Sequence, residues 1–349
     1  MNCIDRFFAT IAREPVDRPA AWLGVPDEAA EPGLFEEYGV RNLHELRMAT
    51  GDDIYSLRIP FRWKGKRAVR IWDWYLDGVT DRKFRNLNAD GCFKNCESEE
   101  DISFFKWPDP VQCTDIEDLK EMAAQVPEGK AGLAFLYSGH FQDTCASFGL
   151  QTAFMNMISN PELVEAVNNR IVNFYLGANE RFYKTAGNKF HAVLIGNDLG
   201  TQRGLMLSPE LIRRFVIPGA RALVDQAHSY GKKVIYHSCG SITDIIPDLA
   251  GIGVDVIHPI QALAAGMDPH NLKKHYGGMI SFCGGIDTQQ LLVQGSPEQI
   301  RARVWELREL FPTGLIFSPS HETILPDVPP RNIRALFEEV TDKSGQTAP

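Results

Sequence analysis

Short apolar runs recur along the chain, and most of them are apolar on both faces rather than at alternate positions. Runs of this kind are typical of strands in a parallel sheet that helices cover on both sides. Five lie in the second half of the chain: AVLIGND (192–198), KKVIYHSC (232–239), VDVIHPI (254–260), MISFCGGI (279–286) and GLIFSPS (314–320). Three more precede them, AAWLGV (20–25), DDIYSLRI (52–59) and GLAFLYS (132–138), so the pattern predicts eight strands.

Helices are predicted between these strands, because a capping residue followed by Pro is a helix start signal. Such signals stand at Asn160-Pro161, Ser208-Pro209, Asp268-Pro269 and Ser296-Pro297. Pro218 is expected to bend the helix that begins after Ser208. Residues 329–340 carry apolar side chains at helical spacing and are predicted to form the closing helix.

Strict alternation of strand and helix leaves two architectures, an open doubly wound sheet and a closed barrel. Eight strands in 349 residues favour the barrel. No G-x-G-x-x-G follows a predicted strand, so nothing supports a dinucleotide-binding fold. The sequence therefore predicts an α/β protein with one (β/α)8 TIM-barrel domain over residues 1–345.

Residues 60–115 interrupt the alternation, first with an aromatic and basic stretch and then with a polar one. We interpret this segment as an insertion or small cap near the barrel mouth. Its aromatic side chains could form a wall for a flat substrate or simply pack in a core: Trp63, Trp72, Trp74 and Tyr75. The Cys92-x3-Cys96 pair has metal-like spacing but no second pair, which favours incidental placement.

The formal charge of -9 and the lack of any Lys/Arg run longer than two exclude a typical nucleic-acid-binding protein. No stretch reaches 18 consecutive apolar residues, and the charged N-terminus does not resemble a secretory signal. We therefore expect a cytoplasmic protein without a membrane partner. Seven scattered cysteines do not indicate a disulfide framework. An oligomer is compatible with the sequence.

In a barrel of this kind, function is placed at the carboxyl ends of the strands. Residues that bind metals or protons gather at those ends: Asn197-Asp198, His237-Ser238-Cys239-Gly240, His258-Pro259, Cys283, Asp287 and Ser320-His321-Glu322. One ring of the predicted barrel thus brings together histidines, cysteines and acids.

His237-x-Cys239 is the sharpest pair, because residues i and i+2 of a strand point to the same side. An imidazole and a thiolate there could bind one zinc ion, although a packed Cys beside a hydrogen-bonded His would give the same pattern. A catalytic zinc takes three protein ligands and keeps one open position. We expect His321 as the third ligand, with Cys283 as its rival, and Asp198 as a displaceable fourth ligand or a partner of the ligands.

Further polar residues are expected to contact a substrate or cofactor at the mouth. His140 and Gln142 follow the strand at 132–138, Gln261 follows the strand at 254–260, and Asp287 ends the strand at 279–286. His258 is a candidate contact as well, although a satisfied core histidine would look the same. Asp198, His237 and Cys239 are the candidate catalytic residues.

Three segments carry a family resemblance: residues 196–261, which include YHSCG and DVIHPIQ, then FCGGIDTQQLL and SPSHETILPDVPPRNIRALFEEV. Together they resemble the uroporphyrinogen decarboxylase superfamily over roughly residues 130–340. The resemblance implies the same barrel. It also implies one of two chemistries, because the superfamily contains metal-free decarboxylases and zinc- and corrinoid-dependent methyltransferases.

The decarboxylases hold their substrate's carboxylates with an arginine-rich motif after the first strand. This sequence has GVPDEAAEP there, which is acidic and would repel a polycarboxylate. The methyltransferases, which act with coenzyme M or on aryl methyl ethers, have H-x-C on one strand and a later Cys. His237 and Cys239 match the first part of that signature, whereas His321 stands where the later Cys is expected.

The resemblance thus implies a zinc-dependent methyltransferase, closest to the methylcobamide:coenzyme M and O-demethylase enzymes. Such an enzyme moves a methyl group between a small thiol, ether or amine and a corrinoid (methylcobalamin) that a partner protein carries. Two alternatives remain: a metal-free decarboxylase acting in tetrapyrrole metabolism, and a non-catalytic barrel that binds a corrinoid or tetrapyrrole.

Overall fold

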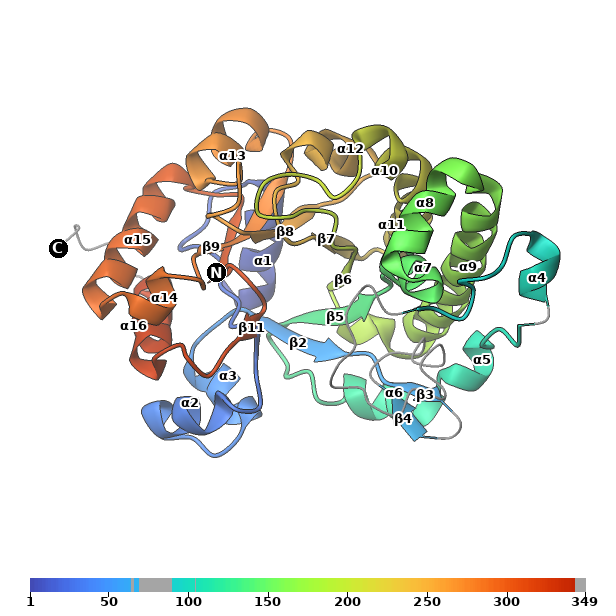
Figure 1. Ribbon diagram of the computed structural model, residues 1–349. Coiled ribbons are helices and arrows are strands. Elements are labelled where there is room, and N and C mark those ends of the chain that lie inside the picture. The colour runs from blue at the N-terminus through green and yellow to red at the C-terminus, as the bar shows by residue number, and fades with distance from the viewer. Residues whose placement is uncertain (64–65, 69–89, 104, 343–349) are drawn as a thin grey trace.

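The computed structural model describes residues 1–63, 66–68, 90–103 and 105–342. Seven parallel strands form one curled sheet in the order β10-β9-β8-β7-β6-β5-β2, with helices around its outer side (Figure 1). Their bounds are β2 (Ile54–Arg58), β5 (Ala131–Tyr137), β6 (Ala192–Gly196), β7 (Lys233–His237), β8 (Val256–Ile260), β9 (Ser281–Ile286) and β10 (Leu315–Pro319). Six fall within a predicted run and β5 begins one residue before its run, so these seven strand predictions are confirmed.

The remaining predicted strand, residues 20–25, closes the ring although little of it is a regular strand. Trp22 N donates to Phe317 O of β10 at 2.9 Å, and Asp53 N, just before β2, donates to Ala21 O at 2.9 Å. The chain then forms β1 (Val25–Pro26), which pairs in parallel with β11 (Thr323–Ile324). The predicted TIM-barrel architecture is therefore confirmed.

Helices follow the strands as the capping residues predict. The principal ones are α9 (Pro161–Ala186), α10 (Pro209–Phe215), α11 (Ile217–Ser229), α12 (Ile246–Gly251), α13 (Pro269–Tyr276), α15 (Pro297–Leu310) and α16 (Pro330–Thr341). Ser208, Asp268 and Ser296 each accept a hydrogen bond from the backbone of the first helical turn. The bend expected at Pro218 is a complete break, since α10 ends at Phe215 and α11 begins two residues later.

Shorter helices connect or flank these elements. They are α2 (Glu31–Tyr38), α3 (Leu43–Ala49), α4 (Glu99–Ser103), α5 (Pro110–Cys113), α6 (Ile116–Ala123), α7 (His140–Phe148), α8 (Leu150–Ser159) and α14 (Leu291–Gln294). An antiparallel pair, β3 (Phe61–Trp63) and β4 (Lys66–Ala68), lies with α4, α5 and α6 on one side of the barrel (Figure 1). The aromatic wall predicted for this segment falls on side chains outside the described part, and its role as a cap stays a prediction.

Apolar side chains fill the space inside the ring and the layer between the sheet and the helices. The inner cluster includes Trp22, Leu133, Leu194, Ile235 and Cys283, all fully buried. The outer cluster joins the other face of the same strands to the helices. Two buried faces on each strand explain why the runs in the sequence are apolar throughout.

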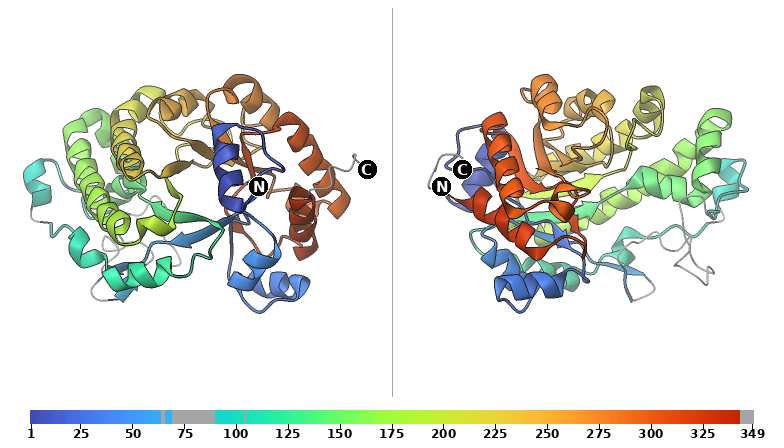
Figure 2. Two further views of the ribbon diagram at one scale, coloured as in Figure 1. Left: turned by 180° about the vertical axis from the view of Figure 1, so that it is seen from behind. Right: turned by 60° about the vertical axis from the view of Figure 1, so that its left-hand side comes forward.

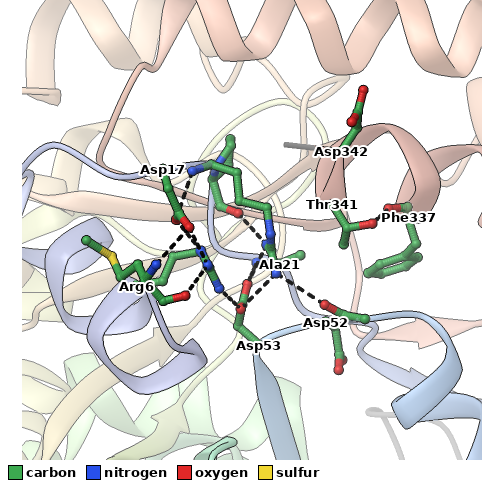
Figure 3. A network of polar contacts seen from close by, with 12 residues as sticks. Arg6, Asp17, Ala21, Asp52, Asp53, Phe337, Thr341 and Asp342 are labelled. Carbon is green, nitrogen blue, oxygen red and sulfur yellow. Dashed lines mark hydrogen bonds and ion pairs between the residues drawn. The ribbon is translucent and has the colours of Figure 1, made fainter. Parts of the chain in front are cut away.

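The helix α1 (Cys3–Ala12) covers the amino-terminal end of the strands, behind the barrel in Figure 1 and in front in the reverse view of Figure 2. Ser281, the first residue of β9, donates its hydroxyl hydrogen bond to Ile11 O at 2.8 Å. Figure 3 shows Arg6 between Asp17 and Asp53, with N–O distances of 2.7 and 2.6 Å. These pairs fix α1 to the start of β2 at the end opposite the predicted site.

Among the described residues, none of the helices is both long and apolar enough to cross a membrane.

Candidate metal centre and cavity

The central residues of the site lie where β7 ends and the chain turns. His237 is the last residue of β7, and its side chain is 2% exposed. Its Nε2 lies 3.4 Å from Sγ of Cys239, so the two side chains meet as the H-x-C spacing predicts. A Cβ at Gly240 would lie 2.5 Å from the backbone carbonyl carbon of Gly200, and glycine at both positions lets the neighbouring loop pass close to the turn.

Asp198, on the loop after β6, completes a cluster of three ligand-type groups. Its Oδ1 accepts a hydrogen bond from the backbone N of Cys239 at 3.0 Å and lies 3.3 Å from Nε2 of His237. The ligand atoms of these three residues all lie within 4.8 Å of one another. The structure therefore brings together the three residues that the sequence marks as candidate catalytic residues.

The spacing of these atoms suits a tetrahedral metal. Bonds of the lengths zinc forms to N, O and S place neighbouring ligand atoms about 3.3–3.8 Å apart. The distances from Nε2 of His237 to Sγ of Cys239 and to Oδ1 of Asp198 are 3.4 and 3.3 Å. A nitrogen, an oxygen and a sulfur in this arrangement form a donor set that fits zinc.

A chain of two hydrogen bonds holds Oδ2, the second carboxylate oxygen of Asp198. Gln142, in the first turn of α7, donates from Nε2 to Oδ2 of Asp198 at 3.0 Å. Tyr137, at the end of β5, donates its hydroxyl to Oε1 of Gln142 at 3.1 Å. Gln142 thus reaches the site through Asp198, and the chain of hydrogen bonds fixes the direction of the carboxylate.

The other side of His237 faces a second pair of polar side chains. Its Nδ1 lies 3.0 Å from Nδ1 of His258 and 3.6 Å from Oε2 of Glu322. Oε2 of Glu322 and Nε2 of His258 are buried, and neither atom has a hydrogen-bond partner within the described part of the chain. The sequence analysis noted Glu322 at the end of the last strand but gave it no role in the site, because its only signal there is its position beside His321.

Charge in the cluster is arranged around His237. Burial lowers the pKa of His237, but the negative charges of Glu322 and Asp198 outweigh burial and hold it well above its usual value. His258 is fully buried beside that cation, and both effects hold its pKa well below the usual value. These opposite shifts favour donation from Nδ1 of His237 to Nδ1 of His258.

Burial raises the pKa of Cys239, yet hydrogen bonds with His237 and His321 lower it further than burial raises it. Burial also raises the pKa of Asp198, and the hydrogen bond and charge of His237 lower it overall. The metal-free site thus stores a proton on His237 beside two groups that favour their anionic forms. A metal cation binding there would displace that proton.

A cavity of about 570 Å³ opens beside Cys239. Its lining residues come from the loops after β7, β8, β9 and β10: Cys239, Gln261, Asp287, Thr288, Gln289, Ser320, His321, Thr323, Leu325, Asp327 and Val328. Gln261 accepts a hydrogen bond from the backbone N of Gly240 at 2.7 Å and so supports the turn that carries Cys239. The sequence analysis gave four of these residues a role, and the others lie in the two segments, 282–292 and 318–340, that carry the family resemblance.

His321 lies on the cavity wall, with its side chain 43% exposed. Its Nδ1 accepts the backbone hydrogen bond of Thr323 at 3.1 Å, and a hydrogen bond with Cys239 raises its pKa. The structure thus places His321 against Cys239, but outside the cluster in which Asp198 is the third member.

Two other candidates lie away from the cavity. His140 is buried, its Nδ1 is 2.8 Å from Oδ1 of Asn168, and its ring faces Gly219 of α11. Burial lowers its pKa to about 4. Cys283 is fully buried in the inner cluster of the barrel, where burial raises its pKa. Neither residue lines the cavity.

Comparison with solved structures finds a methyltransferase from Methanosarcina mazei, with a TM-score of 0.68 and 16% sequence identity. The match covers 97% of this chain and 98% of that one, and it shows a shared fold. A protein from Listeria monocytogenes named as a vitamin-B12-independent methionine synthase matches with a TM-score of 0.47 and 15% identity, covering 95% and 99% of the two chains. No curated protein sequence matches the chain.

The sequence also matches a protein-family model over residues 143–342, more than half of the chain. That region contains β6 to β10 and every member of the two ligand-type clusters. The model describes uroporphyrinogen decarboxylases, and the chain belongs to this uroporphyrinogen decarboxylase (URO-D) family.

Proposed function

We propose that this protein is a zinc-dependent methyltransferase that moves a methyl group between a small substrate and a corrinoid carried by a partner protein. The observation that carries the proposal is the convergence of Asp198, His237 and Cys239 on one point beside the cavity. The shared fold with a methyltransferase supports it. The site of a metal-free enzyme would not need a thiol, an imidazole and a carboxylate within bonding reach of one ion.

His237, Cys239 and Asp198 would hold the zinc ion, and His321 would approach it from the cavity through its contact with Cys239. When bound, zinc supplies a Lewis acid that lowers the pKa of a substrate thiol or polarises an ether oxygen. Its ligands must be deprotonated, and the lowering of the pKa values of Asp198 and Cys239 favours that state.

The surrounding residues position these groups. Gln142 orients the carboxylate of Asp198, and Gln261 holds the backbone of Gly240 next to Cys239. His258 accepts from Nδ1 of His237, which leaves Nε2 of His237 directed at Cys239 and Asp198. A hydrogen-bonded second nitrogen of this kind fixes the tautomer and orientation of a metal-binding histidine.

Metal analysis tests the proposal directly. Protein purified without added zinc is expected to contain about one zinc per chain, and His237→Ala and Cys239→Ala are expected to lose most of it. Cys96→Ala, which removes a half-buried thiol outside both clusters, serves as the control and should keep the metal. Equal metal content in all four proteins would contradict a site at His237 and Cys239.

Methyl transfer is tested separately with free methylcobalamin and a panel of thiols. The change in cobalamin absorbance reports the reaction. The wild-type protein should accelerate demethylation, and Cys239→Ala should not. Decarboxylation of uroporphyrinogen is the competing activity. Its carboxylates would require cationic partners, and no Arg or Lys is among the described residues that line the cavity. Enzymatic loss of carboxylates from uroporphyrinogen would favour the decarboxylase. Corrinoid binding without turnover would favour a non-catalytic barrel.

A further inference from the structure

The cavity beside Cys239 contains two carboxylates and, among the described lining residues, no Lys or Arg. Asp287 directly follows β9, and Asp327 lies between β11 and α16. Arg58, the basic residue at the end of β2, is not part of the lining, and its guanidinium lies 6.0 Å from the centre of the Phe135 ring. The described lining thus carries two carboxylates against one titratable base, His321, and this balance of charge disfavours an anionic group.

The two carboxylates are held differently. Asp287 accepts three backbone hydrogen bonds, from Gln289, Gln290 and Leu291, at 3.1, 2.7 and 2.9 Å, so its position is fixed at the start of α14. Asp327 is exposed at the rim, and the structure describes no ion pair for it. An incoming ligand thus meets one fixed negative charge inside and one available negative charge at the entrance.

A buried hydroxyl adds an anchor for a polar group. Ser320 lines the cavity and is 2% exposed, and its Oγ has no hydrogen-bond partner among the described residues. Buried hydroxyl groups rarely stay unpaired, so this oxygen points to a ligand or ordered water. Leu325 and Val328 supply apolar surface on the same wall.

Resting on the methyltransferase function proposed above, we propose that the small molecule that gives or receives the methyl group is a cation or a neutral molecule, and that the site discriminates against sulfonates and carboxylates. The methyl-bearing atom would lie towards Cys239 and the charged or polar end towards Asp287 and Asp327. Ser320 would bind a hydrogen-bonding group between them.

Three thioethers that share a methylthioethyl body test this selectivity: 2-(methylthio)ethylamine, 2-(methylthio)ethanol and 2-(methylthio)ethanesulfonate. Their end groups are positive, neutral and negative at pH 7, so differences in affinity report charge. Isothermal titration of the purified protein at low ionic strength should give the order amine, alcohol, sulfonate, with steps of about 2- to 5-fold. The differences should shrink when salt is added.

Charge reversal at the rim provides the matched variant. Asp327→Lys should weaken binding of the amine and strengthen binding of the sulfonate. Asp225→Lys, an equivalent reversal on the exposed side of α11, should leave all three affinities unchanged. Ser320→Ala should weaken the alcohol and the amine together without changing the response to Asp327→Lys.

Three results would overturn the proposal: tightest binding of the sulfonate, equal binding of all three thioethers, or binding of none of them. Because binding is measured without turnover, the result is independent of the methyltransferase test. A protein without zinc or methyl transfer that still prefers the amine would refute the function and keep the charge selectivity. Methyl transfer that runs best with the sulfonate would support the function and refute the charge selectivity.

Discussion

Gln142 donates a hydrogen bond of 3.0 Å to Oδ2 of Asp198, while Oδ1 of the same carboxylate faces His237 and Cys239. One helix thereby fixes the direction of a group on another loop. Residues that orient metal ligands change metal affinity by about 10- to 100-fold when they are mutated. Gln142 is thus a positioning residue for the proposed metal centre.

Replacing Gln142 by Leu removes the donor and keeps a side chain of similar size. We expect the zinc affinity of Gln142→Leu to fall by about 10-fold or more, measured by competition with a chromophoric chelator. Tyr137→Phe removes only the far end of the hydrogen-bond chain and should have a smaller effect. If Gln142→Leu binds zinc as tightly as the wild type does, Asp198 does not depend on Gln142 for its orientation.

His321 contacts Cys239 from the cavity, at the position where the family resemblance in the sequence predicts a cysteine. We predict that His321→Cys keeps one zinc per chain and binds it more tightly, because zinc prefers thiolate ligands. His321→Ala should weaken zinc binding without abolishing it, since Asp198, His237 and Cys239 still converge. The zinc-to-protein ratio after dialysis distinguishes these outcomes.

An exposed histidine gives the control for that series. His270→Ala removes a side chain that is 63% exposed and belongs to neither cluster. It should bind zinc like the wild type. Complete loss of zinc from His321→Ala would instead make His321 an essential ligand.

Burial lowers the pKa of His140 to about 4, from an ordinary value of 6.5. As the pH falls through 6.5, the unfolded chain binds a proton that the folded protein refuses until about pH 4. The free energy of unfolding should therefore decrease over this interval, by up to about 1.4 kcal/mol per pH unit from this residue. Above pH 6.5 the residue adds no pH dependence.

Urea unfolding of the wild type and His140→Gln at pH 7 and pH 4.5 measures this effect. The variant loses the hydrogen bond to Asn168 and should be less stable at pH 7, but its stability should fall less on acidification. Comparing the change in unfolding free energy between pH 7 and pH 4.5 in the two proteins cancels the contribution of other titrating groups. Equal changes in the two proteins would show that His140 is not held neutral by burial.

Gly24 has a positive φ of 82°, and a Cβ there would lie 2.5 Å from the backbone O of Glu322. We predict that Gly24→Ala lowers both stability and zinc affinity, because the backbone that carries Glu322 and His321 must move. Gly129→Ala is the matched control, with a φ of 84° and open space around the added methyl group. It should share only the backbone strain, about 1–2 kcal/mol, and keep its zinc affinity.

Thermal unfolding measures the stability of each variant, and competition with a chromophoric chelator measures its zinc affinity. If Gly24→Ala and Gly129→Ala behave alike in both, the contact between Gly24 and Glu322 has no part in shaping the site.

The strands could be predicted because a residue buried on both faces leaves a continuous apolar run, and capping residues marked the helix starts. The His237–Cys239 contact followed from strand periodicity alone, even though the strand itself ends at His237. Periodicity also placed the first predicted strand, residues 20–25, in the ring, but not its irregular backbone. That irregularity depends on contacts with β10 and β11, which no local pattern reports.

The orientation of the polar site residues could not be predicted from the local sequence. His140 and Gln142 are two residues apart at the start of one helix, yet His140 faces Asn168 and Gln142 faces Asp198. Which side of a helix faces the cavity depends on how the helix packs, and two residues cannot fix that rotation. Glu322 was missed for a similar reason, because its approach to His237 depends on the closure of the barrel.

Residues 20–26 complete the ring through β10 and β11, which are made last among the strands. While the ribosome is still synthesising the chain, Ala21 can already accept from Asp53 N, but the backbone groups of this segment that pair with β10 and β11 have no partner. The barrel therefore closes only after residues 315–324 have emerged, and Glu322 and His321 reach His237 and Cys239 in the same event. The barrel thus closes and the proposed metal centre is completed in the same step, late in the synthesis of the chain.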